Sequence, residues 1–468
     1  MVSIVDFRRK VRKTWSNHFT SNSNNDGHAM PDEESPLLVN SYHGGSGPET
    51  RGSWLRQVLF DRRHTPGQNS EKLAIRWTAN VWNVIKATLL SSPVNILLVF
   101  VPIGLIAGKK EWDPTAVFTL NFLAIIPLAA VLSFATEEIS KRLGDTLGGL
   151  LNATFGNAVE LIVSIIALRA GEIQVVQSSM LGSILSNLLL VLGMCFMLGG
   201  FFNMRDANGV PNEQSFQTVT AQTTCSLMTL SSASLVIPAA LYNVLDSGHE
   251  SDKEASILVL SRGTAIILLG LYVLYLFFQL KTHSNLFNPD NLAELEDLEE
   301  DDATMSPWSA AAVLIATTLL VSFCADYLVD SIDAIVQQHN ISKNFIGLIL
   351  IPIVGNAAEH VTACVVAVRN KMDLAMGVAI GSSIQIALLV TPFLVILGWI
   401  IGQPMSLHFE TFETIAFALS VLVVTYTVQD GKSNYLEGAM LMGLYLIIAL
   451  AFWASPSEAL DKALALIF

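Results

Sequence analysis

The chain has 468 residues, of which 52% are hydrophobic and only 14% are charged, and its mean hydropathy is +0.51. Soluble globular proteins carry about 25% charged residues, so this composition indicates an integral membrane protein with the lipid bilayer as its surroundings. The net charge of −14 leaves no dominant basic surface, which argues against nucleic-acid binding.

Residues 1–86 form a polar tail that holds 12 of the 26 Lys and Arg residues. By the positive-inside rule, this excess places the N-terminus in the cytosol. The stretch from Glu33 to Leu38, Glu-Glu-Ser-Pro-Leu-Leu, is similar to an acidic dileucine sorting signal that a sorting adaptor would bind. A chance Leu-Leu in a flexible tail is the alternative. Residues 72–86 have an amphipathic helical pattern, with Trp77 and Trp82 suited to a membrane interface.

Eleven apolar segments follow the tail, each near the ~20 residues that a helix needs to cross a bilayer. They cover 87–108, 114–136, 146–169, 173–201, 216–245, 257–280, 307–329, 344–369, 373–401, 411–429 and 435–455. We therefore expect an all-α polytopic membrane protein with 11 transmembrane helices. Its expected parts are the tail 1–86, an extra first helix 87–108, a first repeat 109–285, an acidic linker 286–305 and a second repeat 306–468.

The division into repeats comes from a motif that occurs twice. Gly156–Glu160 reads Gly-Asn-Ala-Val-Glu, and Gly355–His360 reads Gly-Asn-Ala-Ala-Glu-His. Gly182-Ser183 follows the first motif by 26 positions, and Gly381-Ser382 follows the second by the same 26, so both features repeat at an offset of 199. Such matched spacing indicates an internal duplication. Because each repeat holds five helices, an odd number, the second enters the membrane inverted, as in secondary transporters with a site at the midplane.

Each motif places one carboxylate deep in an apolar segment. Glu160 is the only charged residue in 146–168, and Glu359 is the only one in 344–368 if histidine is neutral. A carboxylate near the bilayer midplane costs about 2.5–3.5 kcal/mol on insertion scales, and neither segment contains a Lys or Arg to pair with it. The two glutamates are therefore predicted to be functional.

The residues around the two glutamates suit a cation. We predict that Gly156, Gly355 and Pro352 open their helices and free backbone carbonyls. Calcium prefers six to eight oxygen ligands, and two carboxylates would balance its charge. The same pair can hold either a dication or protons, and that competition is the basis of an antiport mechanism. Further candidate ligands are the side chains of Asn157, Asn356, Ser183, Ser382, Ser383 and Gln385, with Ser186 and Asn187 close by.

Two of these assignments have a structural alternative. The serines could instead be small residues at ordinary helix–helix interfaces, where serine is common in membrane proteins. His360 is placed to relay protons beside Glu359, but a histidine at a helix interface can equally be a satisfied structural residue.

An acidic run lies between the repeats. Asp290, Glu294, Asp297 and Asp301 have helical spacing, which would gather them on one face and concentrate dications near a cytosolic opening. A solvated linker is the alternative reading of such a run.

The doubled motif, the Gly-Ser positions and the acidic run together resemble the cation/proton exchanger (CAX) family, and within it the vacuolar calcium/proton exchangers of fungi, over about residues 75–455. The resemblance implies export of cytosolic calcium into an acidic vacuole in exchange for protons, with manganese as a second candidate cation. It implies no enzyme activity and no cofactor. The family's central glutamates fall on Glu160 and Glu359, and the neighbouring histidine on His360.

The resemblance also implies a regulatory acidic cluster. Glu137, at the end of the second helix, corresponds to a position that faces the acidic helix of the family. The acids of that helix are Asp290, Glu294, Glu296, Asp297, Glu299, Glu300, Asp301 and Asp302.

Two other functions remain open from the sequence. A sodium-coupled calcium exchanger would differ in the ion that drives uptake. A calcium-permeable channel could also use acidic residues, but it would conduct calcium without a pH gradient.

Overall fold

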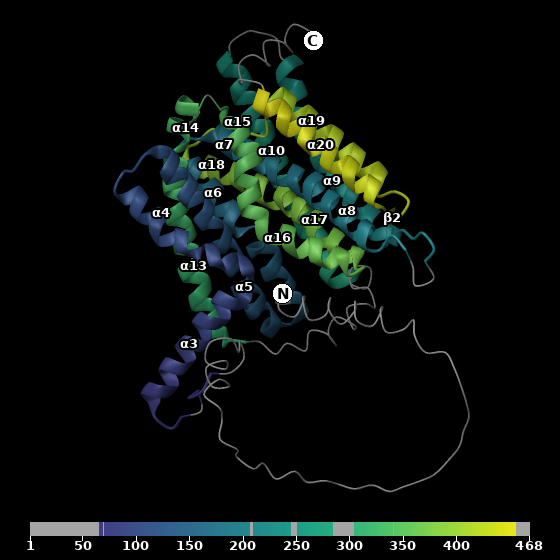
Figure 1. Ribbon diagram of the computed structural model, residues 1–468. Helices are drawn as coiled ribbons and strands as arrows, with labels where there is room; N and C mark the ends of the chain where they lie inside the picture. Colours follow the sequence, from purple (N-terminus) through teal and green to yellow (C-terminus); the bar gives the residue numbers. More distant parts are fainter. Residues whose placement is uncertain are drawn as a thin grey trace, which may run out of the picture. The chain divides into compact units, whose positions relative to one another are not determined.

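In a computed structural model, the described residues are 65–68, 70–205, 209–244, 250–283, 304–339 and 341–454. They form helices, with one short pair of strands (Figure 1). The chain divides into two compact units, Met1–Pro93 and Val94–Phe468. The sorting motif at Glu33–Leu38 and the acidic run at 290–302 lie outside the described residues.

The described part of the first unit contains helix α3 (Leu73–Ser91), on which Trp77 and Trp82 are exposed. The helix runs five residues beyond the predicted 72–86, into the segment assigned to the first span. It ends at Ser91 because Pro93 disfavours the α conformation of the residue before it. Lys86 Nζ donates to Thr65 Oγ1 over 2.9 Å and ties the helix to the preceding loop.

The segment expected to be the extra first helix contains the 3₁₀ helix η1 (Pro93–Val99) and α4 (Phe100–Lys109). The helices expected in the first repeat, two of them π-helical segments (η2 and η3), follow. They are α5 (Pro114–Phe155), α6 (Ala158–Arg169), α7 (Ile173–Leu185), η2 (Ser186–Val191), α8 (Leu192–Phe202), α9 (Thr218–Val244), α10 (Glu250–Phe277) and η3 (Phe278–Thr282).

The second repeat has a similar order of elements. They are α13 (Pro307–Asp330), α14 (Ile332–His339), α15 (Lys343–Phe345), η4 (Ile346–Leu350), α16 (Ile351–Val368), α17 (Met372–Gln385), η5 (Ile386–Val390), α18 (Thr391–Ile401), α19 (Thr411–Thr427) and α20 (Tyr435–Ala454).

Eight helical segments among the described residues are long and apolar enough to cross a membrane, or nine if Leu73–Ser91 and Pro93–Lys109 count as one span. Helix α19 is apolar but has only 17 residues. The chain is thus an all-helical, multi-pass membrane protein.

The predicted boundary between the second and third spans falls inside α5. Ser140 Oγ lies 3.1 Å from Asn152 Oδ1 and 3.3 Å from the Gly148 carbonyl oxygen. In a straight helix, residues 140 and 152 would be about 18 Å apart. The chain therefore turns back within α5, and the returning part leads into α6. The predicted span 146–169 is consequently two helical pieces rather than one continuous helix.

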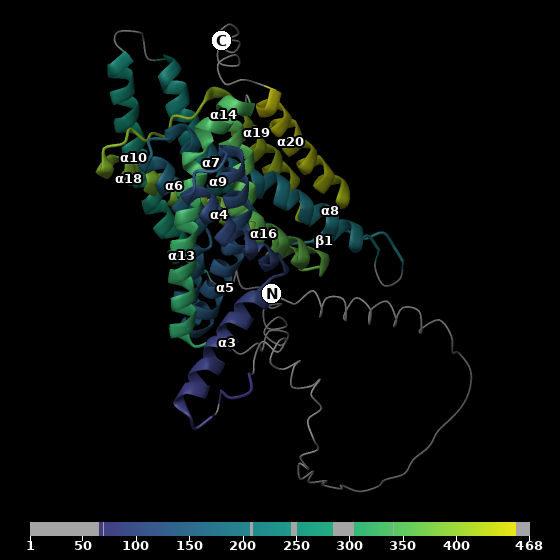
Figure 2. The ribbon, with the colours of Figure 1, turned by 60° about the vertical axis from the view of Figure 1, so that its left-hand side comes forward.

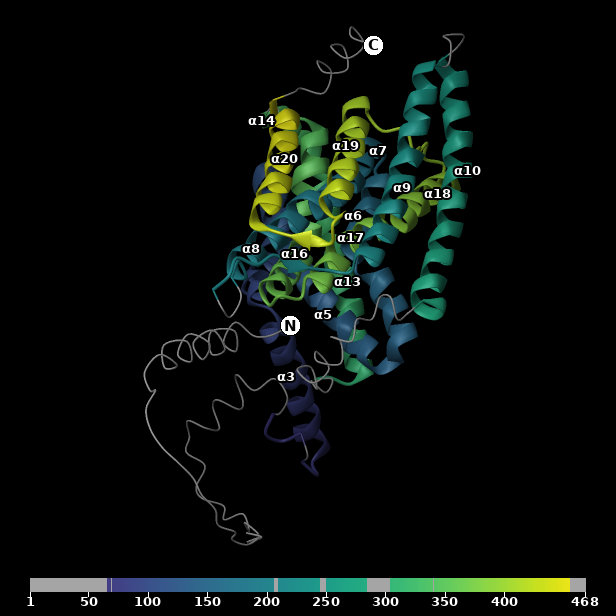
Figure 3. The same cartoon turned by 90° about the vertical axis from the view of Figure 1, so that its right-hand side faces the viewer.

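The two halves interleave. Helix α5 packs along α13 and α16, α8 along α20, and α9 along α19 (Figures 1 and 2). Small residues allow the α8–α20 contact, since a β-carbon at Gly438 would lie 2.5 Å from the Gly193 carbonyl oxygen. Strands β1 (Gln214–Ser215) and β2 (Lys432–Ser433) pair antiparallel and join the loops before α9 and α20. Figure 3 shows α19 and α20 beside each other.

Candidate ion-binding site

Glu160 and Glu359 come from different repeats and meet in the core. Glu160 is in the first turn of α6 and is 4% exposed, and both of its carboxylate oxygens are buried without a hydrogen bond. Glu359 lies in the middle of α16, partly buried, with Oε2 also unpaired. No ion pair among the described residues involves either carboxylate. The core therefore holds two acidic groups without a base.

The glycine of each motif faces the glutamate of the other. A β-carbon at Gly355 would lie 2.5 Å from Glu160 Oε1, and one at Gly156 would lie 3.8 Å from Glu359 Oε1. Each carboxylate thus lies beside the backbone of the opposite motif. Glycine is thus needed at 355 because any side chain there would occupy the place of the Glu160 carboxylate.

Apolar side chains surround the rest of Glu160. A small cavity beside it is lined mainly by apolar residues from α5, α6, α13 and α16, among them Phe122, Ile125, Val163 and Leu328. A negative charge in such surroundings is unfavourable without a counter-charge. The geometry therefore fits a carboxylate that carries either a proton or a bound cation.

The predicted opening of the helix occurs in only one motif. Gly156 and Asn157 separate α5 from α6, with Asn157 at φ −100° and ψ 25°. Helix α16 is continuous through Gly355, so the prediction was wrong for the second motif. Pro352 lies inside the span Lys343–Val368, and since proline has no backbone N–H it leaves one helical hydrogen bond unmade there. The irregularity lies just before it, in the π-helical segment η4.

Polar side chains from both repeats converge next to the first motif. Asn157 Nδ2 donates to Gln385 Oε1 over 2.6 Å, and Ser382 Oγ donates to Asn157 Oδ1 over 2.8 Å. Asn187 Nδ2 donates to Ser382 Oγ over 3.1 Å, and Ser382 also lies within hydrogen-bond reach of Glu359. The structure thus brings together the predicted residues Asn157, Ser382 and Gln385.

Other oxygens around the glutamates are buried without a partner. They are Asn356 Oδ1, Asn187 Oδ1 and Ser164 Oγ, in addition to the carboxylate oxygens. Leaving a buried polar atom unpaired is expensive, about 1–3 kcal/mol, and a bound cation would satisfy several at once. Because carboxylate, amide and hydroxyl oxygens are the ligands that calcium prefers, this donor set fits a hard divalent cation.

Ser164 was not among the predicted site residues. It follows Glu160 by four positions, and residues at this spacing share a helix face. That spacing could have indicated it.

The remaining predicted residues, His360, Ser383 and Ser183, lie outside the hydrogen bonds around Asn157. His360 is 9% exposed, and its Nε2 is 3.2 Å from Ser186 Oγ, so it connects α16 to η2. Ser383 Oγ donates to the Ala379 carbonyl of its own helix over 3.0 Å and is not drawn into the site. Ser183 is buried on α7, and no hydrogen bond given for the described residues links its side chain to the carboxylates.

Matched glycines of the two repeats have different surroundings. A β-carbon at Gly182 would collide with the backbone of Leu348, and one at Gly347 would lie 2.8 Å from Ser178 Cβ. Helix α7 is therefore pressed against η4. The counterpart of Gly182 in the second repeat, Gly381, has open space within 4 Å, as has Gly377. The contact of α7 with η4 at Gly182 is therefore tightly packed, or closed, whereas the corresponding position on α17, Gly381, has no close neighbour.

Polar contacts fasten the closed end. Ser178 Oγ donates to Glu413 Oε1 over 2.6 Å, and Gln174 Nε2 donates to Glu410 Oε1 over 2.7 Å. Lys343 Nζ lies 2.8 Å from Glu172 Oε2. These contacts hold α7 of the first repeat to the second.

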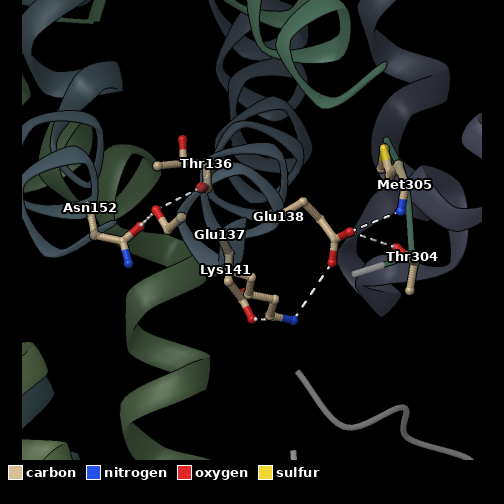
Figure 4. Close-up of polar contacts among 8 residues, drawn as sticks. Thr136, Glu137, Glu138, Lys141, Asn152, Thr304 and Met305 are labelled. Carbon is tan, nitrogen blue, oxygen red and sulfur yellow. Dashed lines mark hydrogen bonds and ion pairs between the residues drawn. The ribbon is translucent and has the colours of Figure 1, made fainter. Parts of the chain in front are cut away.

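The part of α5 just before its turn holds the chain that follows the acidic run (Figure 4). Glu138 is 1% exposed, and its Oε2 accepts from Met305 N and Thr304 Oγ1, both over 3.1 Å. Glu137 instead pairs with Lys141 at 3.3 Å. The neighbour of the predicted residue thus anchors the linker. The acids at 290–302, which the resemblance implies that Glu137 faces, lie outside the described residues.

Known proteins resemble this chain over both repeats. The family model of the sodium/calcium exchanger protein matches residues 114–281 and 309–454, one match per repeat. The vacuolar calcium ion transporter of Schizosaccharomyces pombe is 53% identical over 81% of this chain and 88% of its own length. The Ca2+/H+ antiporter of Aphanothece halophytica is 42% identical over 77% of this chain and 96% of its own length.

A solved structure shares the fold. The crystal structure of the Ca2+/H+ antiporter protein YfkE is 35% identical, covers 77% of this chain and 99% of its own, and superimposes with a TM-score of 0.64. Family match, identity and fold agree, and the chain belongs to the cation/proton exchanger (CAX) branch of the sodium/calcium exchanger protein family.

Proposed function

We propose that this protein is a secondary antiporter that moves cytosolic calcium into the vacuole in exchange for protons. The observation that carries the proposal is the pair of the buried Glu160 and the partly buried Glu359, which opposite repeats contribute and which form no ion pair among the described residues. The relatives, a vacuolar calcium ion transporter and two Ca2+/H+ antiporters, support the same ions.

The topology we propose has eleven crossings. To the eight long spans it adds the pair that ends at Lys109, the segment that ends with α6, and α19. With the basic tail in the cytosol, the turn within α5, after Leu143, then lies on the cytosolic side, and five crossings per repeat make the repeats inverted.

In this topology, the fastened contact between α7 and η4 lies at the luminal end. The unfilled counterpart at Gly381 lies toward the cytosol. These features support a conformation that is closed to the lumen and open to the cytosol. Exchange of the two packing arrangements between the repeats would open the other side.

The exchange follows from the chemistry of the pair. Calcium from the cytosol would bind the Glu160 and Glu359 carboxylates and the unpaired amide oxygens, with Asn356 free to turn toward it. After the change of access, luminal protons would replace calcium on the same oxygens. His360 would pass protons between Glu359 and Ser186, and Ser382 and Gln385 would hold Asn157 in place. Neither carboxylate then remains uncompensated in the membrane.

The acidic run is proposed to enrich calcium at the cytosolic opening. Its C-terminal neighbour, Met305, is held by Glu138 and by Arg142 Nη2, which donates to the Met305 carbonyl over 3.4 Å. This attachment holds Met305 beside the turn of α5, close to Glu137, and supports a regulatory role for Glu137.

Calcium uptake into proteoliposomes under imposed ion gradients tests the function. A proton gradient, acid inside, should drive uptake, and an equal sodium gradient should not. Uptake driven by sodium alone would instead indicate the sodium-coupled exchanger, and uptake without either gradient a channel.

A further inference from the structure

Two cysteines meet between the repeats. Cys195 lies on α8 and Cys364 on α16, and their thiols are within hydrogen-bond reach of each other. Cys195 is fully buried, whereas Cys364 is partly exposed. The chain's other two cysteines are buried elsewhere: Cys225 lies on α9 with its thiol against Thr425, and Cys324 lies on α13.

The backbones of α8 and α16 approach closely around the thiols. One turn after Cys195, a β-carbon at Gly199 would lie 3.1 Å from the Ala367 carbonyl oxygen. One turn further, Asn203 Nδ2 donates to the Val368 carbonyl over 3.2 Å. A disulfide needs α-carbons about 4.4–6.8 Å apart, and a helix contact made through glycine permits that separation.

The thiol pair is close to the ion site along the helix. Cys364 follows Glu359 by five residues, which is about 7.5 Å along the axis of α16. It follows His360 by four residues and so lies on nearly the same face. A movement of α16 at Cys364 would therefore displace both residues.

We propose that Cys195 and Cys364 are a redox-sensitive pair that a peroxide converts to a disulfide joining the two repeats. The partly exposed Cys364 sulfur attacks hydrogen peroxide, the O–O bond breaks, and a sulfenic acid and one water form. The Cys195 sulfur then displaces the hydroxyl as a second water, forming the S–S bond. The two thiols lose two protons and two electrons, and the peroxide takes up both.

The bond would change the geometry of the site. The sulfurs must move from hydrogen-bond distance to about 2 Å. Because the backbones of α8 and α16 are already in close contact, we expect part of this shift to displace α16 and the residues that it carries. The expected loss of transport rests on the proposed function, whereas the cross-link itself does not.

A cleavable full-length chain tests the cross-link. A protease site is inserted within residues 284–303, the protein is treated with hydrogen peroxide, free thiols are alkylated, and the chain is cut and run on a non-reducing denaturing gel. The halves should stay joined and separate on adding dithiothreitol. Cys195→Ser and Cys364→Ser should each abolish the joining.

The matched control is the double variant Cys225→Ser/Cys324→Ser, which keeps only the proposed pair and should still cross-link. It should also lose most of its calcium uptake on peroxide treatment and regain it with dithiothreitol. Halves that separate in this variant would overturn the proposal, as would joined halves with unchanged uptake. If the untreated protein shows no proton-driven uptake, the proposed function fails while the gel result still decides the cross-link.

Discussion

The two repeats carry the same motif in different states. In the first, the chain breaks at Gly156 and Asn157 is bound by Ser382 and Gln385. In the second, α16 is unbroken and the side chain of Asn356 is buried without a hydrogen bond. Related sequences in one molecule thus adopt two different conformations. An inverted-repeat transporter needs this property, since alternating access exchanges the conformations of its halves.

Removing either central carboxylate, Glu160 or Glu359, should abolish the paired-carboxylate site to which both repeats contribute. Glu160→Gln and Glu359→Gln keep the size of the side chain but leave one carboxylate to balance a doubly charged ion. Proton-driven calcium uptake should be lost in both.

The variants should elute like the unaltered protein on size exclusion, because no salt bridge is broken. Uptake near the normal rate in either variant would disprove the paired-carboxylate mechanism. Ser383→Ala, whose hydroxyl bonds only to its own helix, is the control and should transport normally.

Matched glycines test whether the repeats exchange conformations. Gly381→Ala adds a methyl group in open space, so calcium binding from the cytosolic side should be unchanged. In the opposite state, however, this position would take the crowded place of Gly182, and turnover should fall several-fold, about 1 kcal/mol or more for overpacking.

Gly182→Ala should disfavour the present conformation, because the added methyl group crowds the Leu348 backbone. Gly381→Ala should instead disfavour the opposite conformation. The measurements are calcium binding in detergent and initial uptake rate in proteoliposomes. Equal behaviour of the two variants would refute the exchange of conformations.

The two asparagines should differ in what they stabilise. Asn157→Ala removes two hydrogen bonds, so the free energy of unfolding without calcium should fall by about 1 kcal/mol per bond. The melting temperature without calcium should fall with it. Asn356→Ala removes an unpaired amide and should leave that temperature unchanged or slightly raised, but weaken calcium binding. Thermal unfolding with and without calcium separates the two effects, and an equal loss of stability in both variants would count against the asymmetry.

The smallest effect is expected from the acidic run. Changing Asp290, Glu294, Asp297 and Asp301 to Asn or Gln should reduce uptake at low calcium and low salt, and leave the maximal rate intact. Exposed charges act over about 10 Å at 0.1 M salt, so the effect should fade as ionic strength rises. An unchanged curve at low salt would make the run a solvated linker.

The sequence predicted what depends on composition and spacing. Charge-free apolar segments predicted the membrane fold, and the offset of 199 predicted that Glu160 and Glu359 come from duplicated halves. It could not predict which repeat breaks its helix, because both contain Gly-Asn and tertiary packing decides. The sequence also could not predict the contact of Gly355 with Glu160. A glycine in a membrane helix is compatible both with flexibility and with close packing. The place of Ser383 depended on helix rotation, which the pattern Gly-Ser-Ser leaves open.

Proton release on calcium binding is the most direct test of the shared site. Because protons and calcium compete for the same carboxylates, binding should displace about one to two protons per calcium, and affinity should fall by up to about tenfold per displaced proton for each unit that pH drops. Calorimetry from pH 5.5 to 8, in buffers with different ionisation enthalpies, gives both numbers. The account predicts proton release that diminishes in Glu160→Gln and Glu359→Gln. Calcium affinity independent of pH, with no proton released, would contradict it.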